Sequence, residues 1–244
     1  WGIHHSLHDM ASEKLVTRMV VRSSVLLSKW EKVEKIIYCS EKSRAHHGIL
    51  GYPPSKSALI PNGFDCDEFS PDINTRTLVR DSLALDPSHI VIGNFGRFHP
   101  VKDHELLLRA FAEVVVEFPL ARVVLAGADV VEGNATLYGL VQSLGIAEHV
   151  RLLGPRTGMP ALYNALDVYV LSSKSEAFPN VLGEASACGV PSISTDVGDA
   201  AIILGGTGAI VPPGDQAEMA RALRLMLVHD PGERRAAGAM ARAH

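Results

Sequence analysis

The spacing of hydrophobic positions changes along the chain, and the changes mark out short strands and helices. From residue 89 onward, continuous runs of valine, isoleucine and leucine alternate with stretches whose apolar positions recur every three or four residues. The first kind of run is typical of a strand buried on both faces, and the second of an amphipathic helix. The runs that predict strands are HIVIGNFG (89–96), RVVLAG (122–127), HVRLLG (149–154), LDVYVLSS (166–173), VPSIST (190–195) and GAIVPP (208–213).

Helical stretches separate these strands, and several of them end at a glycine or before a proline. They are predicted at 103–117, 134–145, 157–165, 180–189, 198–204 and 216–228. Regular alternation of strands and helices predicts a doubly wound α/β domain built on a parallel sheet. Ligands of such sheets bind outside the carboxyl ends of the strands, so the loops after each strand are where chemistry is expected.

The residues before position 70 carry a shorter version of this pattern. KIIYCS (35–40) predicts a buried strand, and a helix follows it up to about residue 51. SALIPNGFD (57–65) predicts another strand that ends in a turn, because the Pro-Asn-Gly tripeptide within it favours a turn.

A further helix is predicted over residues 12–30. Its apolar positions are Leu15, Met19, Leu26 and Trp30, and its basic positions are Lys14, Arg18 and Arg22. Two interpretations stand: a surface helix of an α/β domain, which we favour, and a basic amphipathic helix lying on a membrane.

Composition narrows the functional classes. Apolar residues make up 47% of the 244 positions and charged residues 20%, as in folded globular proteins. A formal net charge of −4 provides no basic field, so nucleic acid is not expected as a partner. The three cysteines are scattered and fit neither a disulfide framework nor a zinc ribbon, which favours a reducing, cytoplasmic location. The eleven histidines show no metal-binding spacing, so no metal is expected.

Both ends of the sequence suggest a piece of a longer protein. The chain begins with Trp1 rather than methionine, and its last residues up to His244 still have a helical pattern. No run reaches the roughly 18 uncharged apolar residues of a transmembrane helix, and no signal peptide is recognisable.

Two cations follow the strand at 89–96. Arg97 comes directly after it, and Lys102 opens the next helix, so the two charges could converge on one phosphate group. The alternative is a pair of solvated surface charges. Gly93 and Gly96 permit a tight backbone here, but GNFG is not the GxGxxG of dinucleotide-binding proteins.

The segment SEAFPNVLGE (175–184) places two carboxylates around a helix start. Asn180 is a suitable N-cap, which would leave the following amides, beginning with Val181, free to bind an anion. Glu176 lies in the preceding loop and Glu184 about one turn into the helix, where each could accept hydrogen bonds from hydroxyl groups. The pattern indicates a ligand with a charged middle and hydroxylated ends. Alternatively, Glu184 is a favourable charge near a helix N-terminus and Glu176 a solvated acid.

Four segments in order strengthen this interpretation: IPNGFDCDEFSPD (60–72), GRFHPVKDHELLLRAF (96–111), VRLLGPRTGMPALYNALDVYVLSS (150–173) and EAFPNVLGEASACGVPSISTDVG (176–198). Together they resemble the retaining glycosyltransferases of GT-B fold known as family 4, or glycosyl transferases group 1. The resemblance covers nearly the whole chain and is strongest to the polysaccharide and lipopolysaccharide branch.

The resemblance implies transfer of a sugar from a nucleotide-diphosphate donor to a glycan or lipid-linked acceptor, with retention and without a metal or other cofactor. Arg97 and Lys102 match the family's diphosphate-binding pair, Glu176 the glutamate beside the donor sugar, and Glu184 the glutamate that holds the ribose. The matching donor-side loop positions are Gly96, Phe178, Pro179, Asn180 and Val181. His5 matches a catalytic histidine that reaches the donor sugar, with His4 as the alternative.

The resemblance also implies a domain plan. Residues 1–70 correspond to the end of an acceptor-side Rossmann-like domain, and 71–244 to the nucleotide-sugar-binding domain. The sequence departs from the family pattern at Ala177 and Asp103, where glycine is usual, and it lacks the glycine-rich loop of the first domain. Peripheral association with the inner face of the membrane is an alternative to a purely cytoplasmic location.

Rival functions remain open at this point. One is a sugar-nucleotide epimerase or a phosphorylase-like enzyme of the same fold, although no lysine for pyridoxal phosphate is recognisable. Another is a non-catalytic nucleotide-sugar-binding fragment. A nicotinamide dehydrogenase ranks last, because no GxGxxG follows a strand.

Overall fold

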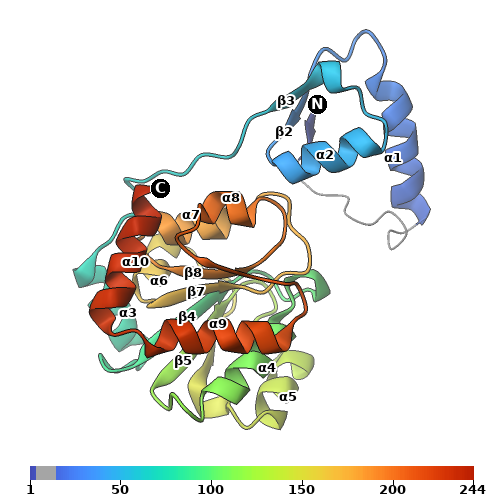
Figure 1. Ribbon diagram of the computed structural model, residues 1–244. Helices are drawn as coiled ribbons and strands as arrows, with labels where there is room; N and C mark the ends of the chain where they lie inside the picture. The colour runs from blue at the N-terminus through green and yellow to red at the C-terminus, as the bar shows by residue number, and fades with distance from the viewer. Residues whose placement is uncertain (4–14) are drawn as a thin grey trace. The chain divides into compact units, whose positions relative to one another are not determined.

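The computed structural model describes residues 1–3 and 15–244. They form two compact units (Figure 1). The first unit contains Trp1–Gly63 with the short stretches Ser175–Pro179 and Val197–Asp199, and the second unit contains the rest. The chain thus passes into the second unit after Gly63, somewhat before the boundary predicted at residue 70. The physical reason is Phe64, whose ring packs directly against Gly183 of the second unit.

The first unit is built on a small parallel sheet with the strand order β1-β2-β3. Its elements are β1 (Gly2–Ile3), α1 (Leu15–Ser28), β2 (Ile36–Tyr38), α2 (Glu41–Ile49), a 3₁₀ turn (Pro54–Lys56) and β3 (Ser57–Leu59). Both predicted strands are present. The core of this unit consists of Val33, Ile36, Tyr38 and Tyr52.

Helix α1 turns most of its apolar residues away from this core. Leu15 is 71% exposed and Leu26 72%, whereas Val21 and Ser28 are the buried positions. The apolar stripe predicted for this helix is therefore not its core-facing side, because the buried positions lie between the predicted ones. None of the helices described here combines the length and the hydrophobicity of a membrane-spanning segment.

The second unit is a doubly wound parallel α/β domain, as predicted. Its six-stranded sheet has the order β6-β5-β4-β7-β8-β9, and every pairing is parallel. The strands are β4 (Ile90–Phe95), β5 (Ala121–Ala126), β6 (Val150–Leu152), β7 (Val168–Leu171), β8 (Ser192–Thr195) and β9 (Ala209–Val211). The chain winds from β4 towards one edge and then crosses back to β7 and the other edge, so β4 and β7 flank the switch point.

Helices cover both faces of this sheet (Figure 1). They are α3 (Ile73–Ser82), α4 (His104–Val114), α5 (Ala135–Ser143), α6 (Met159–Asn164), α7 (Asn180–Ala187), α8 (Ala200–Leu204), α9 (Gln216–Val228) and α10 (Pro231–Ala243). Helices α4 and α9 pack against each other on one face, while α7 contacts α8 and α10 on the other. Fully buried side chains join the sheet to α4 and α9, among them Ile92, Leu107, Phe111, Leu125 and Leu223.

A single carboxylate fastens the amino end of the sheet. Asp167, just before β7, accepts hydrogen bonds from the Nη2 atoms of Arg76 and Arg80 at 2.6 Å each and from the Val91 amide at 2.7 Å. The Arg80 side chain is 6% exposed and that of Asp167 14%, so this ion pair is largely removed from water. One residue therefore connects α3 to the beginnings of β4 and β7.

Replacing Asp167 with asparagine should destabilise the protein strongly. Asp167→Asn keeps the side-chain size but leaves the buried Arg80 charge without its counterion, which typically costs about 3–5 kcal/mol of unfolding free energy. Urea unfolding followed by circular dichroism measures the change. The control Glu105→Gln breaks the exposed pair with Arg109, which is expected to matter by less than about 1 kcal/mol. Equal, small effects of the two substitutions would contradict the role given to Asp167.

Candidate functional site

The loops after β4 and β5 touch at the carboxyl edge of the sheet. Gly127 has φ +152°, and a Cβ atom there would lie 2.1 Å from the Gly96 carbonyl oxygen, so only glycine fits. Backbone hydrogen bonds continue the contact beyond the strands, from Gly96 to Ala126 at 2.8 Å and from Phe98 to Ala128 at 2.7 Å. The two loops consequently form one continuous floor.

The backbone of Lys102 is fixed by neighbouring strands. Its carbonyl accepts a hydrogen bond from Ser172 Oγ at 2.9 Å, and the buried amide of Asn94 donates to that same hydroxyl at 3.3 Å. Asn94 also donates to the Val170 carbonyl at 2.8 Å. The stem of Lys102 lies along Gly96, since its Cδ would be 3.5 Å from a Cβ built there. Arg97 is exposed, and Lys102 is half-buried.

Asp103 occupies the backbone conformation that glycine usually supplies. Its φ is +48°, in the left-handed region, and its side chain is mostly buried. The carboxylate forms an ion pair with Lys174 Nζ at 3.3 Å, and the Lys174 amide donates to the Val101 carbonyl at 2.7 Å. Aspartate tolerates this conformation better than most residues. The ion pair joins the loop after β4 to the end of β7.

His104 is a buried, neutral histidine at the start of α4. It is 2% exposed, and neither ring nitrogen has a hydrogen-bond partner among the described residues. Burial, and then the charge of Lys102, lower the pKa of His104 to about 4. The imidazole therefore adds no positive charge beside Lys102 at neutral pH.

This burial predicts an acid-sensitive stability. The pKa of histidine is 6.5 in the unfolded chain and about 4 for His104 in the folded protein. Between these two pH values the imidazole is protonated in the unfolded chain but not in the folded one. We expect His104 to remove about 3 kcal/mol of unfolding free energy as the pH falls through that window, with no contribution above it. The free energy of unfolding, measured by denaturant titration at several pH values from 7.5 to 4.5, should fall less steeply with decreasing pH in His104→Leu than in the wild-type protein. The same dependence of the unfolding free energy on pH in both proteins would rule out His104 as the source of the acid sensitivity.

Glu184 lies in α7 and is held by a buried phenol. Tyr163 Oη donates to Glu184 Oε2 at 2.7 Å. Burial raises the pKa of Tyr163 well above its ordinary value, and the nearby Tyr169 and Glu184 act in the same direction. The phenol therefore stays a proton donor to one carboxylate oxygen of Glu184, and the other oxygen has no hydrogen bond from the residues that the structure describes.

A cavity of about 330 Å³ lies among these elements. It is lined by Phe95, Gly96, Ala126, Gly127, Ala128, Pro155, Arg156, Met159, Val181 and Glu184. Gly96, Val181 and Glu184 are predicted site residues, and the structure brings them to one cavity. Arg156 and Met159 were not predicted, because they follow an edge strand and carry no recognisable spacing signal.

The other predicted residues fall in three places. Arg97, Lys102 and Asn180 belong to the second unit, but they are not among the residues that line the cavity. Asn180 is the first residue of α7 rather than the residue before it, so the N-cap expectation is corrected by one position. Glu176, Phe178 and Pro179 belong to the first unit, where Ala177 accepts a hydrogen bond from the Asp199 amide at 2.9 Å. His5, and its alternative His4, lie outside the described residues.

The described part of the chain contains no cluster of side chains suited to binding a metal ion. No group of three or more histidine, cysteine, aspartate or glutamate side chains is close enough there to hold an ion. Burial raises the pKa of the Cys188 thiol to about 12, so that cysteine is neutral.

Comparison with known families now identifies the domain. Residues 89–229 match the family model described as glycosyl transferases group 1. The chain belongs to this family. The match begins at β4 and ends just after α9, and it contains every element that lines the cavity.

Curated relatives are glycosyltransferases as well. D-inositol 3-phosphate glycosyltransferase of Mycobacterium sp. (strain KMS) is 35% identical over 191 residues, which are 75% of this chain and 42% of the relative. The protein of the same name from Rhodococcus jostii (strain RHA1) is 30% identical over 266 residues, covering 100% of this chain and 58% of the relative. The chain thus spans about half the length of the curated relatives it matches.

Solved structures confirm the fold class predicted from the sequence, an α/β architecture of GT-B type. Anabaena Alr3699/HepE, in complex with UDP and glucose, superposes with a TM-score of 0.85 at 25% identity, covering 98% of this chain and 65% of that one. Sucrose-phosphate synthase from Thermosynechococcus elongatus gives a TM-score of 0.82 at 26% identity, covering 97% and 58%.

Proposed function

We propose that the second unit is the donor-binding domain of a retaining glycosyltransferase of family 4, which moves a hexosyl group from a nucleoside-diphosphate sugar to an acceptor hydroxyl. The observation that carries the proposal is the cavity in which Glu184 faces the floor formed by Gly96 and Gly127. Complexes of Alr3699/HepE with UDP and with UDP-glucose support a sugar nucleotide as the ligand of this fold.

The chemistry follows from where charge develops. As the sugar departs, negative charge accumulates on the diphosphate, and Arg97 with Lys102 would offset it without a metal ion. The rigid backbone around Lys102 means that little reorganisation is needed at that moment. Val181, in the first turn of α7, adds an amide at the positive end of the helix dipole.

Hydroxyl recognition falls to the carboxylates. Glu184, with one oxygen held by Tyr163, would accept hydrogen bonds from the ribose hydroxyls through the other. Glu176 would position the donor sugar, and His5 would reach the same sugar from the acceptor-side domain. Phe178 and Pro179 would shape the loop that approaches the donor. We propose that the acceptor hydroxyl takes the place of the nucleoside diphosphate at the anomeric carbon, and that the anomeric configuration of the sugar is retained.

The acceptor has two candidates. A glycan or lipid-linked acceptor, which implies a cytoplasmic enzyme able to work at the inner face of a membrane, follows from the sequence resemblance. A phosphorylated cyclitol is favoured by the curated relatives, whose name specifies D-inositol 3-phosphate. A screen of both acceptor classes with one labelled donor separates them.

Removing either the proposed diphosphate-binding lysine or the proposed ribose-binding glutamate should strongly reduce sugar transfer. In the full-length protein we expect Lys102→Ala and Glu184→Ala to lower kcat/KM at least about 100-fold, as loss of preorganised charge stabilisation typically does. Arg109→Ala, on the exposed side of α4, serves as the matched control and should retain activity. Wild-type turnover in Glu184→Ala would refute the ribose-binding role.

Ligand binding distinguishes the rival functions. Calorimetry should detect UDP or GDP binding that is weakened in Lys102→Ala, and binding of NAD should be weaker than either. Product analysis with a labelled sugar nucleotide separates transfer from epimerisation. Tighter binding of NAD than of any nucleoside diphosphate would overturn the proposal.

A further inference from the structure

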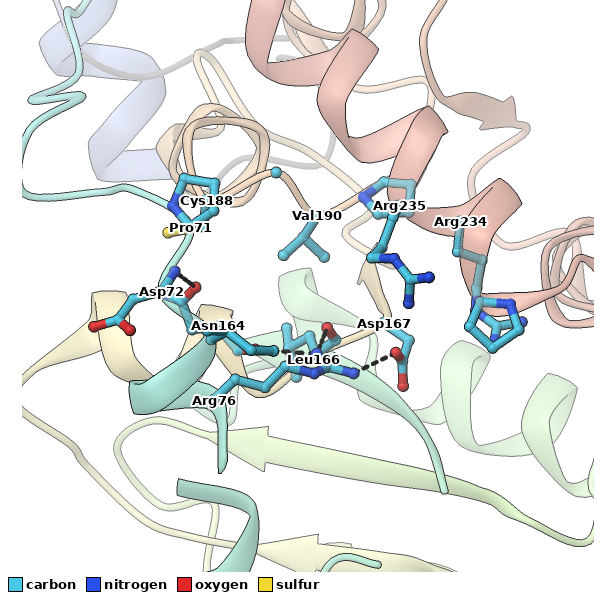
Figure 2. A pocket seen from close by; sticks show the side chains of 14 residues that line it. Pro71, Asp72, Arg76, Asn164, Leu166, Asp167, Cys188, Val190, Arg234 and Arg235 are labelled. Atoms are coloured by element: carbon cyan, nitrogen blue, oxygen red, sulfur yellow. Dashed lines mark hydrogen bonds and ion pairs between the residues drawn. The ribbon is translucent and has the colours of Figure 1, made fainter. Parts of the chain in front are cut away.

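A second cavity, of about 280 Å³, lies at the amino end of the same sheet (Figure 2). It is lined by Pro71, Asp72, Ile73, Arg76, Asn164, Leu166, Asp167, Cys188, Gly189, Val190, Pro191, Pro231, Arg234 and Arg235. All of them belong to the second unit. Because Asp167 precedes β7 and Pro191 precedes β8, this cavity faces away from the carboxyl edge that carries the donor site.

Guanidinium groups outnumber the carboxylates available to them here. Asp167 is shared by Arg76 and Arg80. Asp72 is engaged by the Asn74 and Thr75 amides and the Thr75 hydroxyl as the cap of α3. Burial lowers the pKa of Arg80, Asp167 opposes that shift, and the charges of Arg76 and Arg234 add to it. The arginines therefore crowd one another around one carboxylate.

Arg234 is a buried arginine whose guanidinium is only partly hydrogen-bonded. It is 6% exposed, and its Nη1 donates to the Leu227 and His229 carbonyls at the end of α9. Its Nε has no acceptor in the described part of the chain. A buried guanidinium that is only partly satisfied is costly, so an additional acceptor would stabilise it.

Arg235 is the accessible member of the group. Figure 2 shows its guanidinium pointing into the cavity beside Asp167. The structure gives it no hydrogen bond or ion pair with any described residue. Asp230, at the start of α10, uses its carboxylate to accept the Gly232 and Glu233 amides and so caps the helix instead.

We propose that this cavity binds a small phosphate-type oxyanion, either inorganic phosphate or the phosphate group of a small metabolite. Arg235 supplies the forked donor pair that matches a phosphate, and Arg76 and Arg234 supply the surrounding positive charge. The volume lies just below the roughly 300–1,000 Å³ of typical ligand pockets, which suits a small ligand. The site is distinct from the donor cavity and does not depend on the proposed function.

Calorimetry and thermal melting with inorganic phosphate test the proposal. The full-length protein is titrated at constant ionic strength against a chloride reference, with UDP present to occupy the donor site. We expect one phosphate to bind per chain in the presence of UDP and to raise Tm above the chloride value. Glycerol 3-phosphate as a second probe separates the sources: tighter binding assigns a phosphate ester, and equal or weaker binding assigns inorganic phosphate.

Substitutions locate the site. Arg235→Gln should weaken phosphate binding at least about tenfold. It should leave folding nearly unchanged, because this exposed side chain has no hydrogen bond or ion pair with the described residues. Arg109→Gln and Lys102→Ala should bind phosphate as the wild-type protein does. The proposal is overturned if phosphate acts no differently from chloride, if Arg235→Gln binds it unchanged, or if Lys102→Ala abolishes binding. Failure of the wild-type protein to bind UDP, with phosphate binding intact, would count against the donor site only.

Discussion

The second unit depends on one largely buried ion pair, in which the carboxylate of Asp167 meets the guanidinium of Arg80. Asp167 accepts hydrogen bonds from two arginines of α3 and from the Val91 amide near the start of β4, and it immediately precedes β7. These contacts fix the beginnings of the two strands that flank the switch point. Since β4 and β7 run side by side in parallel, their carboxyl ends are fixed as well, and those ends carry Lys102 and Ser172.

The candidate donor site follows from that arrangement. Its floor consists of two loops that can touch only because residue 127 is a glycine. Lys102, the cation we propose for the site, has its carbonyl held by the Ser172 hydroxyl, which in turn accepts a hydrogen bond from Asn94. The carboxylate of the site is set by Tyr163 from another helix. Segments distant in sequence thus meet in one place, because parallel strands deliver their loops to the same edge.

The strands of the second unit were predictable because most of them are short runs rich in valine, isoleucine and leucine that alternate with longer helical patterns. Helix α3 was missed, although Asp72 is a recognisable N-cap, since its apolar positions are few and exposed. The apolar spacing of α1 was visible in the sequence, but spacing alone does not reveal which positions the neighbouring elements cover, here Val21 and Ser28. Partners such as Tyr163 and Asp167 could not be derived, because they depend on which loops the sheet order brings together.

The candidate site shows the same division. Gly96, Val181 and Glu184 could be picked out from their positions after predicted strands, and the cavity contains all three. Arg156 and Met159 follow the edge strand β6, and nothing in their spacing pointed to a ligand. The roles assigned to Arg97, Glu176 and His5 remain predictions from the family resemblance.

The outermost strands of the larger sheet are short. Both β6 and β9 contain three residues, whereas the central β4 and the neighbouring β5 contain six each. An outer strand offers unpaired amides and carbonyls to any other chain that can align with it, and a short one offers few. The sheet is therefore poorly suited to templating fibrils or edge-to-edge polymers, so its long buried strands can be strongly hydrophobic without endangering solubility.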